Sequence, residues 1–152
     1  MKKISIILLF FLIYFNAYPE ASKPIEILAD SMEWNKKLGQ AIAIGNAKAV
    51  QGQTTIKANK IIAILSEGNS QQIKELQAIG KVVFLKDKQI ATGDRATYYI
   101  NEEKVIITGD VELKRDDNII KGEKLIIDFL SGLSKMEASG KNQKVKMKYT
   151  TE

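Results

Sequence analysis

The side chains that could do chemistry in this chain are carboxylates. The sequence has no histidine and no cysteine, so the commonest general base, the commonest neutral metal ligand and any disulfide are absent. The most regular carboxylates, those of Asp30, Asp94, Asp110 and Glu123, each follow an alanine or a glycine. A catalytic pair occupies one place in a protein, whereas these residues recur along the chain, as is typical of side chains that hydrogen-bond the backbone at bends. The sequence therefore predicts no enzyme activity, no metal site and no cofactor.

Composition and charge indicate one soluble domain. The 152 residues are 45% hydrophobic and 27% charged, as in ordinary globular proteins, and they suffice for one hydrophobic core. The net charge of +5 is mild, and basic residues alternate with apolar ones instead of gathering on one segment. These charges fit a solvated face, and no nucleic-acid partner is expected.

The first segment has the pattern of a secretory signal peptide. Lys2 and Lys3 precede an unbroken apolar run from Ile4 to Phe15. A helix of that length reaches about 18 Å at about 1.5 Å per residue, well short of the ~30 Å hydrocarbon core of a bilayer. We therefore expect residues 1–21 to be a cleaved signal peptide and residues 22–152 to form the exported domain. A retained membrane anchor is the alternative.

After Ser22 the apolar residues follow the period of two that is typical of β-strands, and an internal repeat organises them. A small residue followed by a polar one recurs at positions 29, 58, 93 and 122, which are 29, 35 and 29 residues apart. A second marker is a glycine at positions 45, 80 and 109, each 13 residues before the next first marker, with a weaker copy at Gly140. The constant spacing indicates a repeating strand pair. The insertion falls at 66–78, where residues 70–78 are predicted to be a polar loop with a single turn.

The apolar parity changes at each first marker. Ile25 and Ile27 precede Ala29 at odd positions, whereas Met32 and Trp34 follow it at even positions. A slip of one residue moves every side chain to the other face, so a bulge or corner at each marker would keep both halves of a strand directed inward. The sequence therefore predicts an all-β fold of repeated, bent strand pairs.

Five short motifs follow one another along residues 23–149. They are Pro-Ile-x-Ile at 24–27, Gly-Asn-Ala-x-Ala-x-Gln-Gly at 45–52, Ile-x-Ala-Asn-Lys-Ile at 56–61, Thr-Gly-Asp-Val-x-Leu at 108–113 and Ile-Lys-Gly-Glu-Lys-Leu at 120–125. Their order and spacing resemble the OstA-type domain of LptA-like lipopolysaccharide-transport proteins. The resemblance implies an open, V-shaped β-jellyroll in the periplasm, with an apolar trough for the acyl chains of lipid A. It also implies head-to-tail pairing of copies into a bridge between an LptC-like inner-membrane protein and an LptD-like outer-membrane protein.

Placing alternate residues of each unit inward gives one apolar face. By resemblance, Ile25 and Ile27 lie near the N-terminal joining edge, and Phe84 and Tyr98 match inward aromatic positions of the family. Lys74 and Arg95 are candidates for contacts with lipid A phosphates. A plain packed core is the competing interpretation of the same face. The predicted lipid-binding residues are Ile25, Ile27, Met32, Trp34, Ile61, Phe84, Tyr98, Ile100, Leu113, Ile127 and Phe129.

The last segment, residues 143–149, alternates lysines with Val145, Met147 and Tyr149, as expected of a terminal edge strand. Edge lysines ordinarily discourage association, but the resemblance implies pairing with the N-terminal edge, around residues 25–28, of the next molecule. Two other functions stay open. One is an LptC-like protein anchored by the apolar run at 4–15. The other is a β-helical, polysaccharide-acting enzyme, which the repeat length permits although no cluster of carboxylates supports it.

Overall fold

Alternating apolar and polar residues form ten strands among the residues that the structure describes. The structure is a computed structural model that describes residues 23–68 and 72–151, so the predicted signal peptide lies outside the described residues. All described strands belong to one antiparallel sheet, and the predicted all-β fold is confirmed. The strands are β1 (Glu26–Leu28), β2 (Ser31–Asn35), β3 (Gln40–Gln51), β4 (Thr54–Leu65), β5 (Ile73–Lys86), β6 (Gln89–Tyr99), β7 (Lys104–Arg115), β8 (Asn118–Asp128), β9 (Leu133–Glu137) and β10 (Lys146–Lys148).

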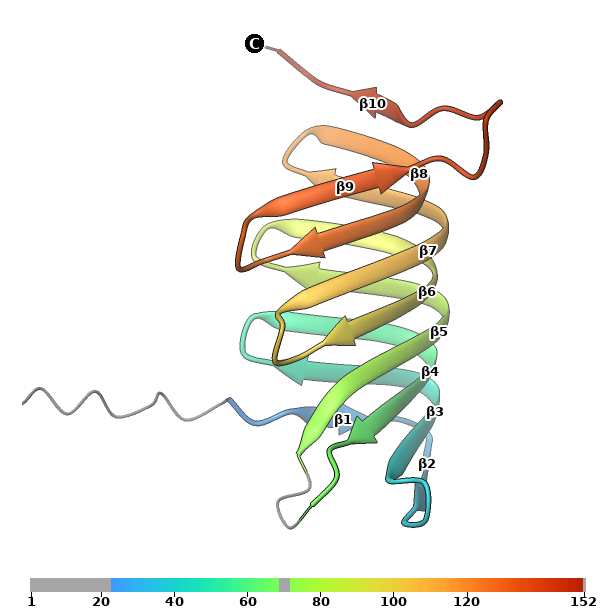
Figure 1. Cartoon of the computed structure of the whole chain (residues 1–152), viewed down its shortest axis with the longest axis vertical. Coiled ribbons are helices and arrows are strands. Elements are labelled where there is room, and N and C mark those ends of the chain that lie inside the picture. Colours follow the sequence, from blue (N-terminus) through green and yellow to red (C-terminus); the bar gives the residue numbers. More distant parts are fainter. Residues whose placement is uncertain (1–22, 69–71, 152) are drawn as a thin grey trace, which may run out of the picture.

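The sheet is a meander whose two ends are built from interrupted strands. From β3 to β8, each strand pairs with the next one in the chain. At one end, β2 pairs with the first half of β3 and β1 with its second half. At the other end, β10 pairs with the first half of β8 and β9 with its second half. Figure 1 shows the strands stacked along the long axis of the molecule, with β1 and β2 at one end and β10 at the other.

Each long strand bends at a corner that divides the sheet into two arms. The register of pairing shifts at the same level in every interval of the meander, beside residues 45–46, 58–59, 80–81, 93–94 and 109–110. One arm, the short-turn arm, ends in the two-residue turns 52–53, 87–88 and 116–117 and includes β1 and β10. The other, the long-turn arm, ends in the turns 36–39, 100–103 and 129–132 and at the link between β4 and β5, and it includes β2 and β9.

At three of these corners a glycine of β3, β5 or β7 faces a polar side chain of the adjacent, preceding segment, which is the link between β1 and β2, β4 or β6 respectively. Gly45, Gly80 and Gly109 have φ angles of 82°, 82° and 86°, a region that favours glycine. A Cβ on any of them would lie only 2.4 to 2.6 Å from the side chain of the neighbouring strand, which is Asp30, Asn59 or Asp94 respectively. The glycine therefore makes room for the side chain that fills the corner.

The corner side chains also hydrogen-bond across the bend. The N–H of Asp30 donates to the carbonyl of Gly45 at 2.9 Å, and Nδ2 of Asn46 donates to Oδ2 of Asp30 at 2.9 Å. The N–H of Asp110 donates to Oε2 of Glu123 at 3.3 Å. The predicted bends at the repeat markers are confirmed, and the recurring carboxylates are parts of the corners.

Three predictions need correction. Residues 73–78 are strand rather than loop, because Leu76 and Ala78 are buried on the inner face and pair with β6. Gly140 does not continue the second marker, since it lies between β9 and β10 and, unlike Gly45, Gly80 and Gly109, faces no side chain. The β-helical enzyme is also wrong: a β-helix stacks parallel strands, whereas all pairs among the described strands are antiparallel.

Replacing Gly109 with alanine tests the corner. The added Cβ must adopt a strained φ and also displace the side chain of Asp94, so we expect a loss of about 2–4 kcal/mol in the free energy of unfolding. Gly132 is the matched control, because its φ is 74° but nothing lies within 4 Å of its Cβ position. Gly132→Ala should cost only about 1 kcal/mol. Equal losses in urea denaturation would show that the Asp94 side chain does not need the glycine.

Candidate functional site

An unbroken row of mostly apolar inner positions crosses each arm. Each row follows the register of pairing from strand to strand, so its members lie side by side on one face of the sheet. On the short-turn arm the row is Ile27, Ala49, Ile56, Phe84, Ala91, Leu113, Ile120 and Met147. On the long-turn arm it is Trp34, Ala41, Ala63, Leu76, Tyr98, Val105, Ile127 and Ser134.

Aromatic side chains connect the two arms across the middle of this face. The ring of Phe84, on the short-turn arm, lies 5.8 Å from that of Tyr98 and 5.9 Å from that of Phe129, both on the long-turn arm. Such pairs add about 0.5–1.5 kcal/mol beyond the burial of their area. Burial raises the pKa of Tyr98, the charge of Glu103 adds to this rise, and a hydrogen bond to Thr54 opposes it. The arms are therefore held together by packing at mid-length.

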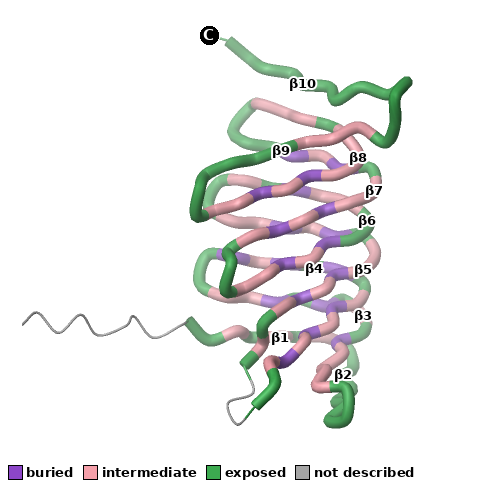
Figure 2. Tube along the Cα trace, in the orientation of Figure 1, coloured by how far each residue is buried: buried purple, intermediate pink, exposed green. Residues whose placement is uncertain are grey.

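The structure places all eleven predicted lipid-binding residues on this inner face, but in three different environments. The five in the middle are almost fully buried: Ile61, Phe84, Tyr98, Leu113 and Ile127. Four are half-buried against them: Ile25, Ile27, Ile100 and Phe129. Met32 and Trp34 are exposed at the β2 edge, by 56% and 62%. Figure 2 shows this distribution, with buried positions along the middle strands and exposed ones at both ends.

The C-terminal end carries a matching apolar surface that the predicted site did not include. Met147 pairs with Ile120 on the inner face and is 59% exposed, and Val145 and Tyr149 share its parity and are exposed too. Their alternation with lysines was the available signal. The prediction also missed the small buried residues, chiefly alanines of β3 and β4, because it considered only large side chains.

A cavity of about 340 Å³ opens between the tips of the two arms. Thr54 and Lys86 line it from the short-turn arm, and Tyr98, Ile100 and Glu103 line it from the long-turn arm. The cavity therefore marks the mouth of the inner face, where polar and apolar side chains meet.

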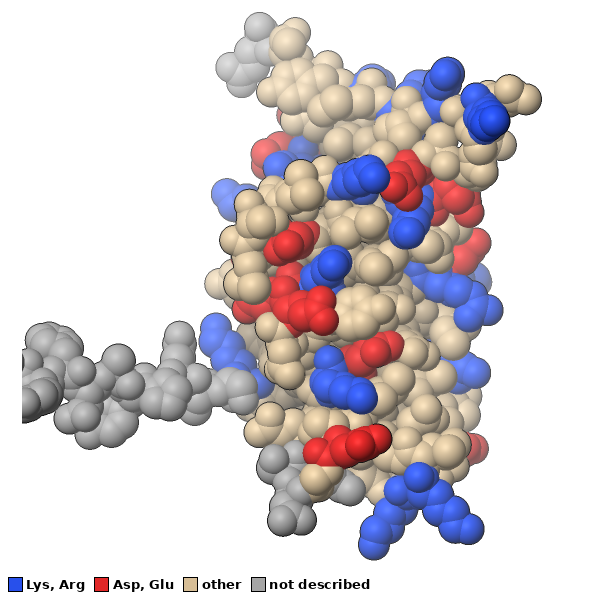
Figure 3. All heavy atoms as spheres, viewed as in Figure 1, with Lys and Arg blue, Asp and Glu red and all other residues tan. Residues whose placement is uncertain are grey.

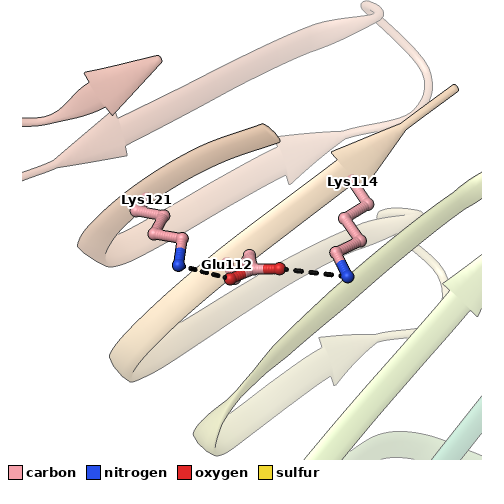
Figure 4. A network of polar contacts seen from close by, with 3 residues as sticks. All are labelled: Glu112, Lys114 and Lys121. Carbon is pink, nitrogen blue, oxygen red and sulfur yellow. Dashed lines mark ion pairs between the residues drawn. The ribbon is translucent and has the colours of Figure 1, made fainter. Parts of the chain in front are cut away.

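The outer face is charged, with both signs interspersed on the side that Figure 3 shows. Glu112 bridges Lys121 of β8 at 2.9 Å and Lys114 at 3.3 Å, and these hydrogen bonds lower the pKa of Glu112 (Figure 4). Exposed ion pairs of this kind add little stability. Arg95 is exposed on this face beside the corner and does not line the cavity, so its contact with lipid A phosphates stays a prediction.

Within residues 23–68 and 72–151, no group of three or more acidic side chains could hold a metal ion. The same residues contain no helix long and apolar enough to cross a membrane.

An open antiparallel sheet, bent at repeated corners around one apolar face, defines a β-jellyroll that is not closed at its ends. The chain belongs to the family described as the LptA/(LptD N-terminal domain) LPS transport protein, whose model matches residues 26–133. The fold resembles the crystal structure of LptH, the LptA-homologous periplasmic component of the lipopolysaccharide transport device of Pseudomonas aeruginosa. The TM-score is 0.76 and the sequence identity 18%, over 85% of this chain and 96% of that one.

Sequence relatives carry related names. Lipopolysaccharide export system protein LptH of Pseudomonas aeruginosa is 25% identical over 116 residues, which are 72% of this chain but only 65% of that protein. Lipopolysaccharide export system protein LptA of Haemophilus influenzae is 24% identical over 131 residues, 82% of this chain and 76% of that protein. LPS-assembly protein LptD of Nitrosomonas europaea is 39% identical over 59 residues, 39% of this chain and 8% of that protein.

The inner face is buried in the middle and exposed at its N-terminal end, so alanine substitutions at the two places should lower the free energy of unfolding by different amounts. Phe84→Ala should lower the free energy of unfolding by about 3–5 kcal/mol, because Phe84 is 1% exposed and connects both arms. Trp34→Ala should cost less than about 1 kcal/mol, since most of that side chain already faces water. Urea denaturation of both variants measures the difference. A loss at Trp34 as large as that at Phe84 would mean that the N-terminal end is packed rather than open.

Proposed function

We propose that this chain is a periplasmic lipopolysaccharide-transport protein, which passes lipid from the inner toward the outer membrane along its inner face. One observation carries the proposal: the rows of inner positions run without a break from one edge of the sheet to the other. Membership of the LPS transport family and the names of LptH and LptA support it. A path of this kind suits a ligand that enters at one end and leaves at the other.

Lipid must open the mouth to reach this path. The half-buried side chains of Ile100 and Phe129 lie at the mouth and the fully buried Phe84 behind them, so acyl chains must displace the contact between Phe84 and Phe129. Each buried methylene returns about 0.8 kcal/mol, so a few of them offset the loss of one aromatic pair. The packed core and the lipid trough are then two states of the same residues.

The proposed function includes no catalysis. The recurring acidic residues Asp30, Asp94 and Glu123 are engaged in corners, and the relatives LptA and LptH are named as export system proteins. We further propose that residues 1–21 are removed on export and that the mature chain works in the periplasm without a cofactor.

Photo-crosslinking in cells tests the lipid path. A benzophenone amino acid in place of Phe129 should yield an adduct with lipopolysaccharide, because this aromatic side chain lies half-buried at the mouth. The same probe in place of Tyr99 is the control, because Tyr99 points to the outer face beside the inward Tyr98. Adducts at both positions, or at neither, would contradict an inner-face path.

We also propose that copies join head to tail and that the same edges meet the inner- and outer-membrane partners. The outer edges of β1, β2, β9 and β10 are unpaired among the described strands, and each end exposes inner-face side chains, Trp34 at one and Met147 at the other. Pairing of the C-terminal edge with the N-terminal edge of the next copy would continue both rows. Because this contact joins two different surfaces, it does not close and grows with concentration.

Deletion of residues 141–152 tests this assembly. The deletion removes β10 and its exposed side chains, so the mature protein should become monomeric in light scattering while it still binds lipid. Trp34, the single tryptophan, gives a second readout. Its emission should shift to the blue with increasing concentration of the full-length mature chain but not of the truncated one. A full-length chain that stays monomeric to roughly millimolar concentration would rule out self-assembly.

A further inference from the structure

The tip of the short-turn arm carries a polar row directly above its apolar row. These side chains have inward parity and lie next to the turns 52–53, 87–88 and 116–117. Three acidic residues, Asp87, Asp116 and Asp117, lie in the turns themselves, beyond this row. We call the row the polar lip: Gln51, Thr54, Lys86, Gln89, Arg115 and Asn118.

The tip of the long-turn arm is apolar at the facing positions. We call these residues the apolar lip: Leu65, Ile73, Ile100 and Phe129, all buried or half-buried against the core. The one acidic side chain that lines the cavity between the lips, Glu103, comes from this arm. An anion at the mouth would therefore be repelled by Glu103 of the long-turn arm and attracted by Lys86 and Arg115 of the polar lip.

The polar lip has free hydrogen-bonding capacity. The ammonium of Lys86 lies 4.7 Å from the centre of the Phe129 ring, which holds it at the mouth without neutralising it. Neither Lys86 nor Arg115 takes part in an ion pair among the described residues. Gln89 lies opposite Lys86 on one neighbouring strand and opposite Arg115 on the other. Its Oε1 atom is buried and has no hydrogen-bond partner among the described residues. Two cationic donors thus flank an unused acceptor.

We propose that the polar lip binds the phosphorylated sugar headgroup of the lipid whose acyl chains enter the inner face. The inference rests on the proposed function and adds the site and orientation of the headgroup. Phosphate oxygens accept hydrogen bonds from Lys86 and Arg115, and a sugar hydroxyl donates to Gln89. The headgroup therefore lies over the short turns, and every bound lipid faces the same way.

Binding of two lipids to the mature full-length chain tests the lip. Diphosphorylated lipid A should bind about tenfold or more tightly than enzymatically dephosphorylated lipid A at low salt. The double variant Lys86→Gln/Arg115→Gln should reduce this preference to within about threefold, with little change for the dephosphorylated lipid. Lys86→Arg should retain the preference, because it keeps the charge.

The matched control removes two charges from the outer face. Lys48 and Lys57 are exposed there and lie opposite each other on β3 and β4. The double variant Lys48→Gln/Lys57→Gln should therefore keep the full preference for diphosphorylated lipid A. Equal binding of the two lipids by the unmodified chain, or a full preference in the lip variant, would overturn the headgroup site and leave the proposed function standing. If neither lipid binds the unmodified chain, the proposed function itself fails. Lip-dependent binding of inorganic phosphate alone would assign the site to free phosphate and also overturn the inference.

Discussion

The pairing of a glycine with a polar side chain at the corners of β3, β5 and β7 is the constraint on which the rest of the structure depends. The register of pairing shifts there in every interval of the meander, and the apolar parity of β4, β6 and β8 changes at this level, so apolar residues face inward both before and after the bend. Without it, one arm would present its apolar side chains to water. Because Asp30, Asn59 and Asp94 fill their corners from the neighbouring strand, each bend also ties two strands together. The inner face is a consequence of these local contacts.

These corners can be predicted from the sequence because the signals for them, the repeat markers and the parity of the apolar residues, lie within a few residues of each bend. Repeat markers gave the positions of the corners, and parity gave the correct face for all eleven predicted site residues. Neither signal could show how far the arms close, since Phe84 meets Phe129 only through the folding of distant strands. The start of β5 was missed for a related reason: Leu76 and Ala78 are strand residues because they pack on β6, whereas the polar residues around them resemble a loop.

The two arms are similar in backbone and different in chemistry. Both carry an apolar row, yet one ends in polar side chains and the other in apolar ones. The turns explain part of the difference, because two-residue turns bring strand ends close to solvent, whereas the longer turns of the other arm fold back over the core at Ile100 and Phe129. A structure of the same fold is only 18% identical, so this backbone tolerates wide changes in sequence.

The corner has one more consequence, for length. Because each strand from β3 to β8 bends at the same level and hydrogen-bonds only to the adjacent strands, a further strand pair could be added without any change in how a pair is built. Strands lie about 4.8 Å apart, so one further pair would lengthen the inner face by roughly 10 Å. The number of repeats in the sequence therefore sets the length of the inner face.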